Sequence, residues 1–324
     1  MANIKEIARQ AGVSVSTVSR VLNGHPHVAQ EKRQAVLDTV RRLNYSRNLN
    51  AVQLIKGRSG MIGVLLPYIH HPYFTMLLEG IAREALEAGV QLVLCQTDYR
   101  TEREVGMLER LRMKGLDGVI VCSRALEWER LEPYAAFGPL VVCERPGSKQ
   151  VSAVYIDHYR CFREAMDYLH RRGHRRIGFS LGRGGSSSSR ERRRAYADML
   201  AEWSEPAREA WVLPGCFTIE DGAQLLKRVL AMNERPTALI VTGDEVAVGL
   251  MSEAARQGVR IPGDLALIGF DNQPISRMFD LTTIDNGLTD MGGAAFRLLH
   301  ERLTGRGEIV QRELPFSLVE RSTV

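Results

Sequence analysis

What the sequence lacks excludes several classes of protein. No stretch approaches the roughly 20 consecutive apolar residues that a membrane-spanning helix needs, and the amino terminus has no apolar segment like that of a secretory signal. The five cysteines lie far apart and form no C-x-x-C pair, which argues against a disulfide framework and fits a reducing compartment. We therefore expect a cytoplasmic protein that does not bind membranes.

Residue combinations typical of catalysis are also missing. No Ser-His-Asp spacing, metal-ligand cluster or pair of catalytic carboxylates emerges from the sequence. The stretch GRGGSSSS, residues 182–189, is glycine-rich but lacks the G-K-[ST] of a P-loop, and the adjacent His70 and His71 are poorly spaced for binding one metal. We expect no catalytic residue, no metal and no cofactor, with an α/β-type enzyme as the less favoured alternative.

Positive charge is concentrated at the start of the chain. The 324 residues carry a net charge of +5, but residues 1–60 hold ten Lys/Arg against three Asp/Glu, and the remainder is close to neutral at −2. The length suits two or three domains, and 44% hydrophobic residues are ordinary for a globular protein. We expect an anionic partner for the amino-terminal segment alone, with a solvated basic surface as the alternative.

The first 45 residues predict three short helices. The apolar residues at helical spacing in the first two are Ile4, Ile7, Ala8, Ala11, Val18, Val21 and Leu22. Gly12 ends the first helix, because glycine turns left-handed there without strain, and Ser14 caps the next. A third helix spans about Gln30 to Leu43. Two short helices joined by a tight glycine turn describe a helix-turn-helix, although small helical bundles with no DNA role share this pattern.

The run AGVSVSTVSRVLNG, residues 11–24, resembles the DNA-binding signature of the LacI family of bacterial transcription regulators. The resemblance continues through Asn44-Tyr45, Asn48 and Leu54, and it implies a recognition helix that reads DNA. The side chains expected to contact bases are Val15, Ser16 and Arg20, of which the arginine suits guanine. Those expected to hold the DNA backbone are Ser14, Thr17, Ser19, Asn23 and His27.

Residues 46–60 join this headpiece to the rest of the chain. A helix over about 48–56 would be short and marginal alone, so a plain linker is the alternative. The family resemblance implies a hinge helix that forms when two copies meet on DNA, with Leu54 wedged into the minor groove and Ala51 packed closely. Arg47 stands where the family usually has proline, which either loosens the approach to the hinge or adds a phosphate contact.

From Met61 onward, apolar strands alternate with helices, which predicts parallel sheets with helices on both faces in two similar halves. The resemblance implies an α/β body of two subdomains, like that of periplasmic binding proteins, with three chain crossings near 157, 284 and 317. The expected parts are a helix-turn-helix domain, 1–45; a hinge and linker, 46–60; one subdomain, 61–157 with 285–316; and the other, 158–284 with 317–324.

Ligands bind beyond the carboxyl ends of strands in open parallel sheets, which directs attention to the residues there. Tyr73 and Phe74 follow the first strand and either stack on a ligand or pack into the core. Arg192 matches the family's effector-binding arginine, whose planar fork holds two oxygens. Asp271 matches an aspartate that accepts hydrogen bonds from effector hydroxyls, with a turn-capping role as the alternative.

Three further positions are assigned to the same pocket. Glu144 stands where the family more often has Asp, so its carboxylate either reaches further or forms an internal ion pair. Gly243 replaces a usual Asn, which enlarges the pocket and suggests a larger ligand. Leu288 lies where pocket walls are often apolar or aromatic.

The sequence is therefore interpreted as a repressor that binds double-stranded operator DNA as a homodimer in the nucleoid. Its small-molecule effector is expected to be a sugar, with a maltodextrin-type oligosaccharide favoured. A sugar-transport binding protein is the alternative, which the basic headpiece and the missing signal sequence oppose.

Overall fold

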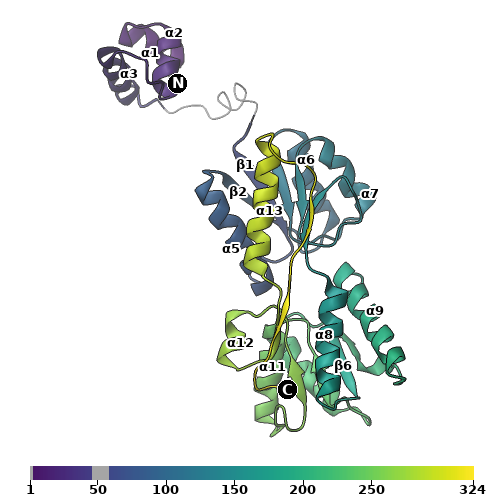
Figure 1. Ribbon diagram of the computed structural model, residues 1–324. Coiled ribbons are helices and arrows are strands. Elements are labelled where there is room, and N and C mark those ends of the chain that lie inside the picture. Colours follow the sequence, from purple (N-terminus) through teal and green to yellow (C-terminus); the bar gives the residue numbers. More distant parts are fainter. Residues whose placement is uncertain (1–2, 46–57) are drawn as a thin grey trace. The chain divides into compact units, whose positions relative to one another are not determined.

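Three helices form the amino-terminal unit of the chain, in a computed structural model that describes residues 3–45 and 58–324. They are α1 (Ile4–Ala11), α2 (Val15–Leu22) and α3 (Gln30–Arg42) (Figure 1). Gly12 ends α1 with a φ of 65°, in the left-handed region that the sequence predicted. Ile7, Val18 and Val36, one from each helix, are fully buried and form the core of this unit. The predicted hinge residues Arg47, Ala51 and Leu54 lie outside the described residues.

The second unit, Ser59–Val324, contains two parallel sheets. The sheet of the first lobe has the order β11-β5-β4-β3-β1-β2. Its strands are β1 (Met61–Leu66), β2 (Gln91–Gln96), β3 (Gly118–Val121), β4 (Leu140–Val142), β5 (Ser152–Tyr155) and β11 (Gln311–Glu313). Its helices are α5 (Pro72–Glu87), α6 (Thr101–Arg112), α7 (Trp128–Leu131) and α13 (Leu288–Leu303), with a 3-10 turn at Glu132–Ala136. All residues of β3 and β4 are buried, as helices on both faces require.

The sheet of the second lobe has the order β7-β6-β8-β9. Its strands are β6 (Ile177–Leu181), β7 (Val212–Pro214), β8 (Ala238–Ile240) and β9 (Ala266–Ile268). Its helices are α8 (His158–Arg171), α9 (Ser187–Glu202), α10 (Ile219–Leu230), α11 (Asp244–Arg256) and α12 (Pro274–Met278), with a 3-10 turn at Glu209–Trp211. The sequence interpretation did not include β7 and α10.

The chain passes between the lobes more than once. After the second-lobe sheet it forms α13, which lies beside α5 of the first lobe (Figure 1), and then β11, which pairs with β5. The last strand, β12 (Ser317–Val319), pairs antiparallel with β10 (Thr283–Asp285). The expected boundaries near 157 and 317 fall after β5 and at the start of β12, and the one near 284 lies inside β10.

Pairs of helices touch through glycine in both lobes. A Cβ added to Gly292 of α13 would lie 2.0 Å from the carbonyl oxygen of Leu77 on α5. In the second lobe, a Cβ on Gly222 of α10 would lie 2.0 Å from the carbonyl oxygen of Val246 on α11. No side chain fits at such distances, so each glycine lets two helix backbones approach directly.

Candidate nucleic-acid interface and ligand pocket

The headpiece presents α2 and the turns at its two ends to solvent. The predicted DNA-contacting residues that are exposed are Ser14, Val15, Ser16, Arg20, Asn23 and His27, while Thr17 and Ser19 are half-buried. Val15 is 41% exposed although it is apolar, whereas Val18 of the same helix is fully buried. An apolar side chain held at a helix start, away from the core, is available to contact a base methyl group.

Several polar side chains of this surface are occupied in holding the helix ends. Ser14 Oγ accepts a hydrogen bond from the Thr17 N–H at 3.2 Å, which is the predicted cap. Asn23 Nδ2 donates to the Ser19 carbonyl oxygen at 2.8 Å. Arg20, by contrast, makes no ion pair with any residue that the structure describes. Its guanidinium therefore keeps its donors for a partner.

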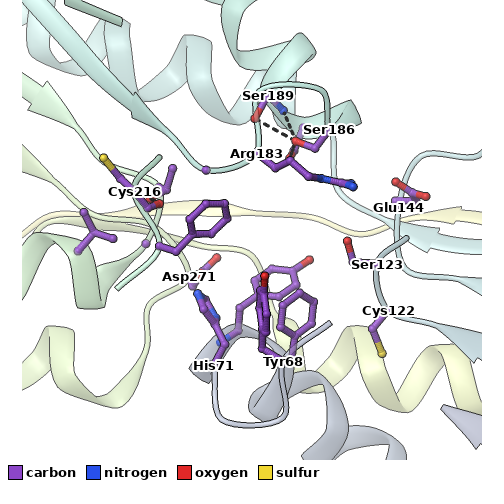
Figure 2. A pocket seen from close by; sticks show the side chains of 18 of the residues that line it. Tyr68, His71, Cys122, Ser123, Glu144, Arg183, Ser186, Ser189, Cys216 and Asp271 are labelled. Carbon is purple, nitrogen blue, oxygen red and sulfur yellow. Dashed lines mark hydrogen bonds between the residues drawn. The ribbon is translucent and has the colours of Figure 1, made fainter. Parts of the chain in front are cut away.

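The second unit contains a pocket at the carboxyl ends of both sheets (Figure 2), with a volume of about 160 Å³. Loops after β1 to β4 line it from the first lobe, and loops after β6 to β9 line it from the second. The structure brings together there Tyr73, Phe74, Glu144, Arg192, Gly243 and Asp271. These residues lie far apart in sequence, and parallel strands bring their loops to one edge.

Leu288 does not belong to this pocket. It is the first residue of α13, only 1% exposed, and it packs in the hydrophobic core with Met291 and Phe296 of the same helix. The expectation of a wall residue at this position is therefore wrong, because the apolar face of α13 turns the side chain into the core.

Arg192 supplies a buried positive charge to the pocket wall. Its side chain is 7% exposed, and its Cζ atom lies 4.0 Å from the centre of the Phe270 ring. Burial lowers the pKa of the guanidinium, and the negative charge of Asp271 opposes that shift. Nε has no hydrogen-bond partner among the described residues, so this cation retains binding capacity toward the pocket.

Asp271 supplies a carboxylate held by two amides. Asn286 Nδ2 donates to one oxygen at 2.7 Å and Gln273 Nε2 donates to the other at 3.3 Å. Burial raises the pKa of Asp271 to about 6, although these hydrogen bonds and Arg192 lower it. Its φ of 96° lies in the left-handed region, which side chains rarely adopt. This backbone conformation holds the carboxylate at the pocket.

A second aspartate supports this loop without lining the pocket. Asp244 accepts hydrogen bonds from the Gln273 N–H at 2.7 Å and from Thr283 Oγ1 at 2.6 Å. Burial raises the pKa of Asp244 well above its usual range, and the charge of Asp271 adds to the rise. Asp244 therefore ties the start of α11 to the segment that carries Asp271.

Glu144 forms the internal ion pair that was one of its two expected roles. Its carboxylate lies 2.6 Å from Arg124 Nε, and it accepts a hydrogen bond from Ser187 Oγ at 3.0 Å. Arg124 in turn stacks on Trp128, with Cζ 4.0 Å from the ring centre. The pair lies in the first lobe and Ser187 in the second, so these contacts connect the lobes at the pocket.

Gly243 leaves space beside Asp271. A Cβ added there would lie 3.5 Å from Asp271 Oδ2, an ordinary van der Waals distance. The φ of −167° is extended backbone that any residue adopts. A side chain would fit at this position, and its absence leaves the pocket larger.

Sequence reasoning missed several lining residues. They include Tyr68, His71, Tyr99, Ser123, His158, Arg183 and Phe217. Burial lowers the pKa of His158 to about 3, with a further contribution from Arg192, so the ring is neutral at pH 7. Its Nδ1 is buried and without a partner among the described residues. Their positions after strands could have indicated Tyr99, Ser123 and Arg183, whereas Phe217 follows β7, a strand that was not predicted.

Two family models match the chain. The model described as bacterial regulatory proteins, lacI family, matches residues 3–48, and that of a periplasmic binding protein-like domain matches residues 166–324. The chain is also 43% identical, over the full length of both proteins, to the uncharacterized HTH-type transcriptional regulator YkvZ of Bacillus subtilis (strain 168). This chain belongs to the LacI family of bacterial regulatory proteins.

Solved structures of LacI-family proteins share its fold. The lac repressor dimer bound to operator and the anti-inducer ONPF superimposes with a TM-score of 0.85 at 25% identity, covering 99% of this chain and 98% of that one. A LacI-family transcriptional regulator from Lactobacillus casei with bound glucose has a TM-score of 0.73 at 30% identity, covering 82% and 99%. The chain is thus a DNA-binding transcriptional repressor with a helix-turn-helix headpiece and a periplasmic-binding-protein-like body.

The described part of this LacI-family chain has neither a metal-binding cluster nor a membrane-spanning helix. Within residues 3–45 and 58–324, no group of three or more His, Cys, Asp or Glu could hold a metal ion. None of the helices in these ranges is both long enough and apolar enough to cross a bilayer. All five cysteines are free, and only Cys95 is not fully buried.

Proposed function

We propose that this repressor binds operator DNA as a homodimer and that a sugar in the pocket controls its operator affinity. The observation that carries the proposal is the combination of Arg192 and Asp271 in one pocket with aromatic rings. A guanidinium fork and a carboxylate bind neighbouring hydroxyls, and the rings of Tyr73 and Phe217 offer faces for the apolar side of a sugar. Glucose bound to the Lactobacillus casei regulator lends support, since that protein has the same fold.

Two sizes of sugar are candidates. The pocket volume of about 160 Å³ lies below the roughly 300–1,000 Å³ of sites for drug-sized ligands and favours a compact sugar. The second candidate is a maltodextrin-type oligosaccharide, which the missing side chain at Gly243 favours. The oligosaccharide would require the two lobes to separate, whereas the compact sugar would not.

The proposed control follows from contacts that the ligand makes with both lobes. A ligand that touches Tyr73 of the first lobe and Asp271 of the second favours the arrangement of lobes in which both contacts form. Such coupling typically changes affinity by about 5–150-fold, or roughly 1–3 kcal/mol. In the proposed dimer two copies of α2 face a palindromic operator, with Val15, Ser16 and Arg20 reading bases. The proposal includes no catalytic step, and the relatives of this chain are likewise named as transcriptional regulators.

A gel-shift assay on DNA upstream of the gene tests the proposal, with titrated sugars as effectors. Changing Val15 and Ser16 together should alter operator preference and leave sugar affinity intact. Arg192→Ala should abolish the sugar response and retain operator binding. No sequence-selective shift by the wild type would end the repressor proposal, and loss of both activities in either variant would indicate misfolding. Sugar binding without any DNA binding would favour the transport-protein alternative.

A further inference from the structure

We propose that the pocket ligand carries a phosphate group, bound at the start of α9 between Arg183 and Arg192. The inference rests on the proposed function, because it specifies the chemistry of the same ligand. It goes beyond a sugar in assigning an anionic subsite to one side of the pocket.

The first support is the amino-terminal end of α9, a helix of 16 residues. Ser186 caps it by accepting a hydrogen bond from the Ser189 N–H at 3.1 Å. The N–H groups of Ser187 and Ser188 have no acceptor among the described residues, as expected for the first positions of a helix. All of these serines line the pocket. Free N–H groups and the positive end of the helix dipole together favour an anion.

The second support is independent of the helix end and comes from Arg192. This arginine follows Ser188 by four residues and Ser189 by three, so the three side chains share one face of α9. Long side chains on a helix lean toward its amino-terminal end, which directs Arg192 toward the serines. The Arg192 side chain is only 7% exposed, and it forms no ion pair with any of the described residues. Its Nε has no hydrogen-bond partner among the described residues. The negative charge of Asp271 offsets only part of the effect of burial on this cation, and a ligand phosphate would add a second counter-charge.

Arg183 adds a second cation to the same side of the pocket. In Figure 2 its side chain extends toward Glu144 from the loop that also carries Ser186, the cap of α9. It donates to the Arg124 carbonyl oxygen at 2.6 Å and stacks on Tyr99, with Cζ 4.0 Å from the ring centre. These contacts hold the guanidinium in place but do not neutralise it, and its Nε is buried without a partner among the described residues.

The carboxylates of the lining leave this positive charge available. Glu144 is matched by Arg124 in the ion pair described above. Asp271 lies in Figure 2 beside His71, apart from Arg183, and Glu245 lies in the first turn of α11. The pocket thus has hydroxyl-binding groups at Asp271 and anion-binding groups at the start of α9. Two arginines and two free N–H groups offer more hydrogen-bond donors than the two oxygens of a carboxylate can accept. The three acceptor oxygens of a phosphate group match these donors better.

The test is the binding of inorganic phosphate to the full-length chain. All three tryptophans, Trp128, Trp203 and Trp211, belong to the second unit, so tryptophan fluorescence during heating follows the unfolding of that unit alone. Phosphate is titrated against chloride at matched ionic strength. The wild type should show a saturable rise in its unfolding midpoint. Arg183→Gln should bind phosphate about tenfold more weakly or worse, as when a charge-assisted hydrogen bond is lost, and Arg183→Lys should recover part of the affinity.

The matched control is Arg193→Gln, on the same helix but outside the pocket and paired with Glu209. It should bind phosphate as the wild type does. Equal phosphate affinity in Arg183→Gln and the wild type would overturn the inference, as would the absence of a phosphate-specific rise in the wild type. A second arm compares glucose with glucose 6-phosphate in the gel-shift assay. If glucose alone changes operator binding, the proposed function stands and the phosphate subsite fails. If phosphate binds at Arg183 but no ligand changes operator binding, the subsite stands and the proposed control fails.

Discussion

Replacing Asp271 with asparagine should stabilise the ligand-free protein at neutral pH. The side chain is 5% exposed, and burial raises the pKa of its carboxyl from 3.8 to about 6 despite the hydrogen bonds from Asn286 and Gln273. One pKa unit corresponds to about 1.4 kcal/mol, so the charged carboxylate costs the folded state on the order of 3 kcal/mol at pH 7.5. A charge kept at such a cost in stability is what the proposed ligand-binding role of Asp271 would require.

The predicted stabilisation depends on pH in a definite direction. Because the pKa of Asp271 is higher in the folded than in the unfolded chain, the folded protein binds the proton more tightly. The cost of the charge therefore grows as pH rises from about 4 to 6 and disappears below that range. Asparagine stays neutral throughout. Gln273 Oε1 is buried and has no hydrogen-bond partner among the described residues. If the side-chain amide of Gln273 flips, this oxygen can accept a hydrogen bond from the N–H of the introduced asparagine.

Urea unfolding of the full chain, followed by tryptophan fluorescence, measures the effect. Asp271→Asn should raise the free energy of unfolding by up to about 3 kcal/mol at pH 7.5 and by less than about 1 kcal/mol at pH 4. The control, Asp167→Asn, removes a carboxylate whose side chain is 48% exposed and should stay within about 0.5 kcal/mol of the wild type at both pH values. An equal gain at both pH values, or a loss of stability at pH 7.5, would refute the reasoning.

Three further predictions use the same stability and binding assays. Gly292→Ala should destabilise the body by roughly 1–3 kcal/mol or more, because its Cβ would meet a backbone oxygen of α5 at 2.0 Å. The control Gly106→Ala, which has open space around it inside α6, should stabilise the body by about 0.5–1 kcal/mol. A Gly292→Ala variant more stable than Gly106→Ala would contradict the close contact at Gly292. Ser14→Ala should cost the headpiece about 1 kcal/mol in circular-dichroism melts, and no change would mean that the cap is dispensable. Gly243→Asn should narrow the pocket beside Asp271 and weaken the binding of an oligosaccharide more than that of a monosaccharide, as measured by calorimetry. An equal loss of affinity for both sugars would mean that residue 243 does not select the size of the ligand.

Long elements could be predicted from the sequence because their patterns repeat. The first helix ends before Gly12 and the second begins after Ser14, as predicted, and α3 ends one residue before the predicted Leu43. The strand β1 begins at Met61, where the alternation of strands and helices was expected to start. The strand β7 was missed because Pro214 and Gly215 interrupt its apolar residues, whereas the equally short strands β8 and β9 lie in longer apolar runs. The helix α10 was missed with it, although Leu225, Leu226 and Val229 mark its buried face. A strand with so few apolar residues is defined by its neighbour in the sheet, here β6, which the sequence does not display.

The site could be predicted only where a position after a strand or a family motif pointed to it. Asp271 and Gly243 follow β9 and β8, and Arg192 belongs to a motif. The directions of side chains could not be predicted. Leu288 turns into the core because the apolar face of α13 does, and Arg183 reaches the opposite lobe because Tyr99 and a carbonyl oxygen hold it there. Such contacts join segments whose spacing in the chain carries no signal.

The return of α13 and β11 to the first lobe affects how the protein is made. The headpiece core is complete once residue 45 has been synthesised, but β5 lacks its neighbour β11 until residue 313 emerges from the ribosome. During that interval Ala295 and Leu299, which complete the core under the first sheet, do not yet exist. A nascent chain therefore exposes an unpaired strand edge and apolar surface while its second lobe is still being translated, the condition under which chains aggregate or recruit chaperones.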